Sequence, residues 1–130
     1  MDRVQKAIEN HKKGYNCAQA VVCAFADKTS FTEDELFRLS EAFGGGMGGT
    51  GGVCGAVSAM VILAGIKNSL GTDALPETNK KTSYINAAEL IAKFEDMNTT
   101  SVCSRLKGQS IRSCDGCIED AVRIMEEMYK

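Results

Sequence analysis

Cysteine is the residue type with the most chemistry to offer in this chain. Six cysteines lie at positions 17, 23, 54, 103, 114 and 117. A chain of 130 residues buries enough surface to fold without disulfides, and permanent disulfides are rare in reducing compartments. Free thiols act as nucleophiles or metal ligands, or they pack as small apolar groups. The position of each cysteine in its predicted helix indicates which role it has.

Four cysteines share a position at or next to the predicted start of a helix, namely Cys17, Cys54, Cys103 and Cys114. A helix N-terminus carries partial positive charge and free N–H groups, which favour a thiolate and lower the pKa of a cysteine. Burial as a structural residue explains any one of them, because cysteine is often buried. The shared placement of all four favours function. We predict them as catalytic thiols or, alternatively, as the ligands of a metal site.

Cys54 is expected to be the most reactive of these thiols. It follows Gly51 and Gly52, the last residues of a segment, 44–52, that contains seven glycines. Such a segment presents backbone N–H groups that can bind an anion, and it can open to admit a reagent. Gly51, Gly52 and Gly55 are therefore the candidate cofactor-binding residues. A plain mobile connection is the alternative.

Three further residues are weaker candidates. Cys23 is rotated by about 120° from Cys17 on one predicted helix, so we expect it to be shielded in the core. Cys117 begins an apolar stripe, yet with Cys114 it forms a Cys-Asp-Gly-Cys spacing typical of a redox dithiol. Both interpretations stay open, and Cys117 is an additional candidate metal ligand. His11 lies on an apolar helical face, where a hydrogen-bonded core histidine is commoner than a ligand.

The elements that must position these residues are all predicted to be helical. Apolar residues recur at three- and four-residue intervals, and no segment alternates like a strand. The glycines of 44–52 form a loop, since each costs a helix about 1 kcal/mol relative to alanine. The predicted helices span residues 2–12, 17–28, 32–43 and 53–66, a segment that begins at Pro76 and continues past Phe94, residues 102–107, and a terminal segment ending near Met128. The sequence predicts one all-α domain over residues 1–130, a compact bundle of six or seven helices.

Composition excludes several partners. The formal net charge is −2 and no basic stripe is present, so no nucleic-acid partner is expected.

The longest apolar stretch, Val53 to Ile66, is about 14 residues, whereas a membrane-spanning helix needs about 20. This stretch is rich in small residues, and we expect a homodimer contact on its exposed side. The charged N-terminus lacks a secretory signal pattern, which predicts a cytoplasmic protein.

The order of the cysteine boxes resembles a known family. Gly14 to Ala20 reads GYNCAQA, and three glycines at 44–46 lead into Cys54-Gly55-Ala56. Both boxes are similar to those of the redox-active protein family defined by a CGAxxG box and four cysteines, the C_GCAxxG_C_C family. One departure is Ala59, which stands where the box has glycine and adds a methyl group at an expected helix contact.

The resemblance also bears on the remaining cysteines. Cys103 matches the third family cysteine. The spacing to Ile118 and Ala121 makes Cys114 a better match than Cys117 for the fourth. The resemblance implies a redox role in a bacterium or archaeon and supplies no substrate.

Three functions fit these residues. In the first, a thiolate such as Cys54 attacks a small-molecule oxidant or the disulfide of a redox partner protein, and a second cysteine resolves the product. In the second, the four cysteines hold an iron–sulfur cluster or another metal, with zinc less favoured because zinc ribbons usually contain two Cys-x-x-Cys pairs. In the third, the cysteines of a non-enzymatic module sense oxidation. We favour thiol–disulfide chemistry, because the glycine loop is expected to leave Cys54 accessible, and the sequence identifies no cofactor with certainty.

Overall fold

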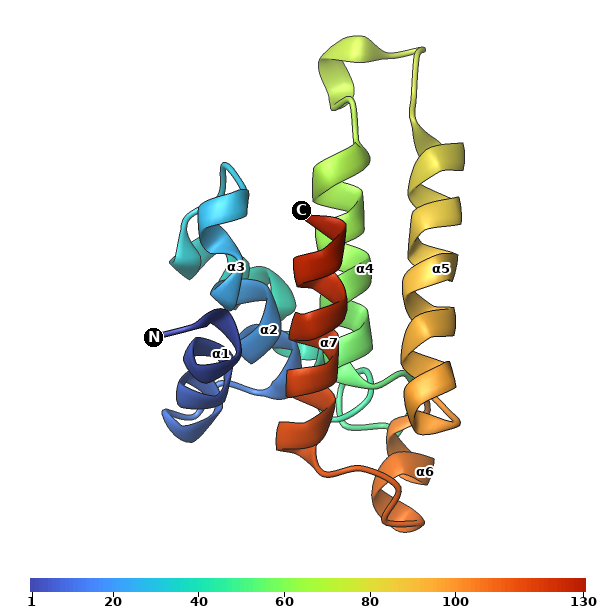
Figure 1. Ribbon diagram of the computed structural model, residues 1–130. Helices are drawn as coiled ribbons and strands as arrows, with labels where there is room; N and C mark the ends of the chain where they lie inside the picture. Colours follow the sequence, from blue (N-terminus) through green and yellow to red (C-terminus); the bar gives the residue numbers. More distant parts are fainter.

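Seven α-helices and no β-strand form the computed structural model, which describes residues 1–130 (Figure 1). The helices are α1 (Arg3–Lys12), α2 (Cys17–Ala24), α3 (Glu33–Ser40), α4 (Gly55–Asn68), α5 (Lys80–Asn98), α6 (Cys103–Gly108) and α7 (Cys114–Met128). Short 3₁₀ turns follow α2, α3 and α4 at Ala26–Lys28, Glu41–Phe43 and Thr72–Ala74. The all-α prediction is confirmed, with seven helices.

Side chains that cap the helices set where several of them begin. Asn16 accepts a hydrogen bond from the backbone N–H of Gln19, and Thr32 accepts one from that of Glu35. The side chains of Gln19 and Glu35 bond back to the cap residues, which confirms the predicted capping box at Thr32. Ser113 caps α7 in a similar way. Because Asn16 and Ser113 precede Cys17 and Cys114, these caps place both cysteines in the first turn of a helix.

The arrangement of the helices brings several N-terminal ends to one end of the molecule. Helix α4 packs against α2, α5 and α7. Helix α7 packs against α1 and α2 and against the antiparallel α4–α5 hairpin, and α6 lies below the starts of α4 and α7 (Figure 1). The core contains 24 buried residues, among them Phe25, Met60, Leu63, Phe94 and Ile118. These apolar faces hold the helix starts in fixed positions relative to one another.

The glycine-rich segment is hydrogen-bonded and packed. Its backbone has positive φ continuously from Gly45 to Gly49, a conformation that glycine adopts without steric cost. The N–H of Gly52 donates to the carbonyl of Gly46 at 2.8 Å. Beyond the glycines, Val53 pairs with Val102 in an isolated antiparallel bridge. The Val53–Val102 bridge therefore holds the end of the glycine-rich segment against the residues that lead into α6.

Two predicted helix starts are wrong. Helix α4 begins at Gly55, because Val53 is held in the bridge to Val102. Helix α5 begins at Lys80, whereas Pro76 lies in the connection after α4, next to a turn that the Glu77 N–H closes on the Ala74 carbonyl.

The apolar stretch in α4 is largely covered by the molecule itself. Its residues from Gly55 to Met60 are buried, and Val61 is 37% exposed. Larger exposed apolar side chains occur at the far end of the α4–α5 hairpin, on Leu70, Leu75 and Tyr84. The predicted homodimer contact on the exposed side of Val53 to Ile66 stays a prediction. None of the helices has the length and apolar character needed to cross a membrane.

Replacing Gly46 by alanine should destabilise the fold more than the same change at Gly49. Both residues have positive φ, +73° and +75°, at which alanine costs about 1–2 kcal/mol. A Cβ on Gly46 would lie 2.7 Å from the Cβ of Cys103, whereas one on Gly49 meets nothing within 4 Å. We expect Gly46→Ala to lower the free energy of unfolding by about 1–3 kcal/mol more than Gly49→Ala, measured by urea denaturation of the reduced protein. Equal losses would contradict this packing.

Candidate functional site

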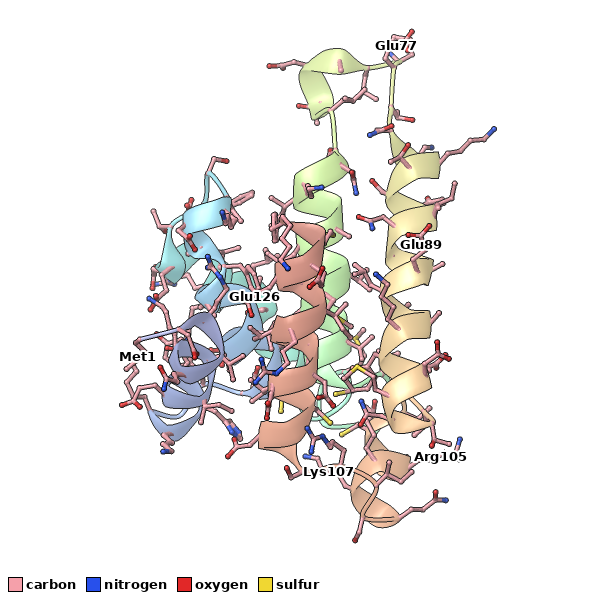
Figure 2. All side chains as sticks on the ribbon, in the orientation of Figure 1. Met1, Glu77, Glu89, Arg105, Lys107 and Glu126 are labelled. Atoms are coloured by element: carbon pink, nitrogen blue, oxygen red, sulfur yellow. The ribbon has the colours of Figure 1, made fainter.

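Five of the six cysteines gather where several helices begin. Figure 2 shows sulfur atoms near the start of α7, beside α4 and above Lys107. Helices α2 and α4 approach closely there, since a Cβ added to Gly55 would lie 3.1 Å from the Ala18 nitrogen and 3.4 Å from the Cys17 Cβ. The members of this sulfur cluster are Cys17, Cys54, Cys103, Cys114 and Cys117. The four predicted cysteines therefore lie in one region.

Cys23 does not belong to the cluster. It is buried, and its sulfur donates to the carbonyl of Glu33 at 3.6 Å. Burial and the Glu33 carboxylate raise the pKa of Cys23 to about 12. The prediction that Cys23 is shielded in the core is confirmed.

Backbone hydrogen bonds hold Cys54 and Cys103 side by side. The N–H of Cys103 donates to the Gly52 carbonyl at 2.6 Å, and the N–H of Cys54 donates to the Ser101 carbonyl at 2.7 Å. The N–H of Ser104 also donates to the Gly51 carbonyl at 3.1 Å. Gly51 and Gly52 thus anchor the start of α6, and Gly55 allows α2 to approach α4. Their predicted role in binding a cofactor stays a prediction.

Cys54 and Cys117 form a buried inner pair. Their exposed fractions are 4% and 1%. The Cys117 thiol donates a hydrogen bond to the Cys54 sulfur, which also receives the backbone N–H groups of Ala56 and Val57. These donors lower the pKa of Cys54 to about 6 although burial opposes the charge, and the bond to Cys54 raises the pKa of Cys117. The inner pair therefore combines a thiolate with a thiol that keeps its proton.

Cys17 and Cys114 form a half-buried outer pair. Burial raises the pKa of Cys17 to about 12, and its hydrogen bond to Cys114 acts in the same direction. The Lys107 ammonium donates to the Cys114 sulfur, and this bond raises the pKa of Lys107. Cys103 lies beside this pair, and its pKa is raised by burial while Lys107 opposes the shift. Cys17, Cys103 and Cys114 are thus the half-buried members of the cluster, and the Lys107 ammonium lies close to them.

Two expectations about reactivity need correction. Helix N-termini were expected to lower the pKa of these cysteines, which holds for Cys54 but not for Cys17 or Cys103. Burial, together with neighbouring sulfurs, outweighs the helix dipole at the latter two. Cys54 was also expected to be accessible through the glycine loop, whereas its side chain is buried. The loop and α6 are bonded together beside it.

Lys107 was not selected from the sequence, and His11 was expected in a different setting. Lys107 stands four residues after Cys103 on α6, a spacing that places both on one helical face and that could have indicated it. His11 was expected to be a core histidine, but its Nδ1 lies 2.7 Å from Asp115 Oδ1 at the surface. These residues are 104 positions apart, so no local pattern reveals the pair. Helices α1 and α7 pack together and bring them into contact.

Three side chains place their ligand atoms within 4.8 Å of one another, those of His11, Cys17 and Cys114. The predicted four-cysteine ligand set contains two of these residues. Cys54 pairs instead with Cys117, and Cys103 lies near Lys107 and Cys114. The cluster thus consists of two sulfur pairs and Cys103, with one histidine beside the outer pair.

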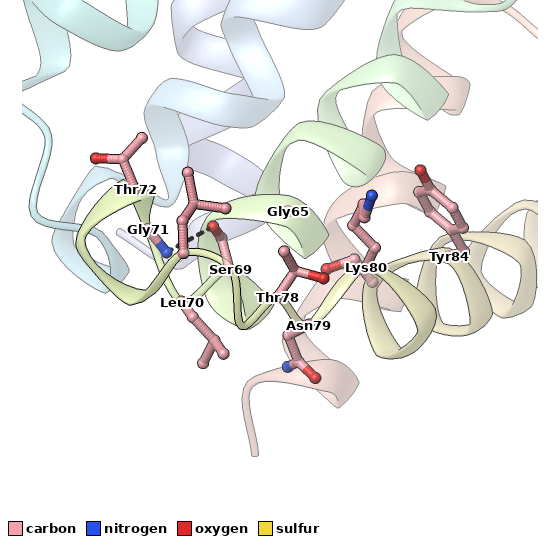
Figure 3. Close-up of a pocket in the computed structure, with 11 residues that line it drawn as sticks. Gly65, Ser69, Leu70, Gly71, Thr72, Thr78, Asn79, Lys80 and Tyr84 are labelled. Atoms are coloured by element: carbon pink, nitrogen blue, oxygen red, sulfur yellow. Dashed lines mark hydrogen bonds between the residues drawn. The ribbon is translucent and has the colours of Figure 1, made fainter.

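A hollow at the end of the α4–α5 hairpin lies outside this site. Its volume is about 300 Å³, and Leu70, Thr72, Asn79, Lys80 and Tyr84 are among the residues that line it (Figure 3). It contains no cysteine, and it adjoins the end of α4 opposite to Cys54. The sulfur chemistry and this hollow are therefore separate features.

Comparison with known proteins identifies one family. The family described as "Putative redox-active protein (C_GCAxxG_C_C)" matches residues 15–128. This match covers both sulfur pairs and Lys107 and leaves out His11. No curated protein and no solved structure matches the chain.

One thiolate should disappear as the pH falls through about 6. The Cys117 thiol and two backbone N–H groups hold the pKa of Cys54 at about 6, well below the usual value near 8.5. Thiolate absorbance of the reduced, metal-free protein should therefore show a step near pH 6 that is lost in Cys54→Ser. Cys117→Ala should move the step to higher pH, because it removes the strongest donor. Cys23→Ala is the matched control and should leave the step in place; an unchanged step in Cys117→Ala would contradict the assigned hydrogen bond.

Proposed function

The chain belongs to the redox-active C_GCAxxG_C_C family, and on this premise we propose that it carries out thiol–disulfide exchange, with Cys54 and Cys117 as its central dithiol. The observation that carries the proposal is the proximity of these two buried sulfurs, which lie close enough for each cysteine to shift the pKa of the other. A reversible disulfide needs two sulfurs within reach, and thiolate attack is the step that forms it.

The environment of the inner pair gives its two sulfurs different chemical roles. With a pKa of about 6, Cys54 is mainly a thiolate at neutral pH and serves as the nucleophile. Its pKa is close enough to ambient pH for the sulfur to stay strongly nucleophilic. Cys117 keeps its proton next to Cys54 and becomes the second sulfur of the disulfide. The inner pair is therefore suited to store two electrons.

The outer pair exchanges these electrons with the surroundings. Cys54 and Cys117 are buried, so an external disulfide first meets Cys114 or Cys17. The Cys114 sulfur, which lies next to the Lys107 ammonium, attacks one sulfur of that disulfide as a thiolate and releases the first thiol. Cys17 then loses its proton, attacks the Cys114 sulfur and releases the second thiol. The external disulfide thereby gains two electrons from the outer pair and is released as two thiols, with one proton from Cys17 and one from solvent, and a Cys17–Cys114 disulfide forms.

A second exchange transfers the disulfide from the outer pair to the inner pair. Cys17 is close enough to both inner sulfurs for their charges to interact. The Cys54 thiolate attacks the Cys17 sulfur of the outer disulfide and releases the Cys114 thiolate. Cys117 then attacks Cys54 and releases Cys17, which takes up the proton that Cys117 loses. The outer pair is again reduced, and the two electrons have come from Cys54 and Cys117.

The partner is defined by this chemistry as a small-molecule oxidant or a redox protein with an accessible disulfide. It would approach the outer pair beside α6 and the start of α7, where Lys107 provides positive charge. We place the reaction in the cytoplasm, because reducing conditions keep such thiols available between turnovers.

Disulfide mapping after equilibration in glutathione buffers tests the proposal. As the fraction of oxidised glutathione rises, acid quenching, alkylation and mass mapping should reveal a Cys54–Cys117 disulfide. Cys54→Ser and Cys117→Ser should each abolish it. Cys17→Ser should slow its formation, because it removes the route through the outer pair. Cys23→Ser is the matched control, since that thiol is buried outside the cluster, and it should change nothing.

Two results would reject this function. One is a cluster that stays fully reduced even in the most oxidising buffer. The other is a stable disulfide that joins Cys114 to Cys117 while Cys54 remains free, because that would make the Cys-x-x-Cys spacing the redox dithiol.

A further inference from the structure

We propose that the reduced protein binds a zinc-type divalent metal ion between α1, α2 and α7, with His11, Cys17 and Cys114 as its ligands. Each residue comes from a different helix, and their ligand atoms lie within 4.8 Å of one another. Imidazole nitrogen and thiolate sulfur are the donors that zinc prefers. The inference goes beyond the proposed function, because it concerns another ligand and adds a residue outside the matched family segment.

The distances between the three ligand atoms allow tetrahedral coordination of an ion after small side-chain movements. Zinc binds sulfur at about 2.3 Å and nitrogen at about 2.0 Å, which places neighbouring ligand atoms roughly 3.5 Å apart. Side-chain rotation at His11, Cys17 and Cys114 can supply the remaining ångström, since all three are only half-buried. Three protein ligands leave a fourth position for water or an exogenous group.

Asp115 supplies the second, independent observation. Its carboxylate lies 2.7 Å from His11 Nδ1, which fixes the ring and leaves Nε2 as the nitrogen free to bind. Histidines that bind metals usually donate their other ring N–H to such an acceptor. A carboxylate paired with a histidine beside two thiols is therefore an arrangement typical of zinc sites. Asp115 acts here as a positioning residue.

The surroundings also admit an ion. A hollow of about 390 Å³ opens over the site, and its lining includes His11, Ser113, Cys114 and Asp115. Lys107 donates to the Cys114 sulfur, and a hydrogen bond of this kind is compatible with a sulfur that also binds metal. An ion can therefore enter from solvent without opening the core around Cys54 and Cys117.

The metal and the outer disulfide exclude each other, and this consequence alone rests on the proposed function. Binding uses both thiolates of the reduced outer pair and releases their protons. An external disulfide that accepts two electrons and two protons converts the pair into a Cys17–Cys114 disulfide and frees the ion. The site would thus hold metal only while its thiols are reduced.

Cobalt binding to the reduced, full-length protein tests the site. Co²⁺ should bind at one ion per chain, with visible ligand-field bands and sulfur-to-cobalt charge-transfer bands, and Zn²⁺ should displace it. His11→Ala, His11→Gln, Cys17→Ser and Cys114→Ser should each remove the high-affinity site. Asp115→Asn should weaken binding by about 10- to 100-fold, as expected when a partner of a metal-binding histidine is lost. Circular dichroism checks that each variant is folded.

Controls separate this site from a four-cysteine site. Cys23→Ser, Cys54→Ser and Cys117→Ser should bind Co²⁺ like the unaltered protein. Three results would overturn the inference: no binding, binding unaffected by both His11 variants, or binding lost in Cys54→Ser and Cys117→Ser. Disulfide mapping of the inner pair in the presence of a chelator gives a separate result, so loss of the metal site and loss of the redox function are distinguishable.

Discussion

The close approach of α2 to α4 at Gly55 is the contact on which the sulfur site depends. Without a side chain at this position, the backbone of Ala18 comes within about 3.1 Å of where a Cβ would lie. Two helix N-termini therefore meet, and Cys17 and Cys54 come together. Helix α7 packs against α1, α2 and α4, which adds Cys114 and Cys117. The redox chemistry thus depends on backbone proximity that larger residues would prevent.

Burial limits how many cysteines of the cluster ionise to thiolates. Every buried thiolate loses hydration and repels the next one, so a group of five sulfurs cannot ionise freely. Cys54 is the exception because a thiol and two backbone N–H groups donate to it. Lys107 supplies the fixed positive charge beside the outer pair. These differences in donors give neighbouring cysteines of the cluster different pKa values.

A polar network of Asp120, Arg112 and Asn98 holds the first half of α7 in place. Asp120 is 6% exposed, yet it accepts two hydrogen bonds from Arg112 and one from Asn98, all at 3.1 Å. The bonds join α7 to the end of α5 and to the connection from α6. A buried carboxylate needs such partners, and here they fix the helix turn that carries Cys114 and Cys117. The hydrogen bonds of Asp120 with Arg112 and Asn98 therefore help to hold Cys114 and Cys117 in position.

The sequence by itself determined the helical class, the capped starts at Asn16 and Thr32, and the placement of four cysteines where helices begin. Capping depends on residues three positions apart, so local spacing is sufficient to predict it. Only the tertiary structure decided that Cys114 and Cys117, which share a Cys-x-x-Cys spacing, have different partners on α2 and α4. It also decided that Cys54 is buried and that His11 meets Asp115, 104 residues away. Burial and sulfur pairing depend on how distant helices pack, and spacing along the chain does not contain that information.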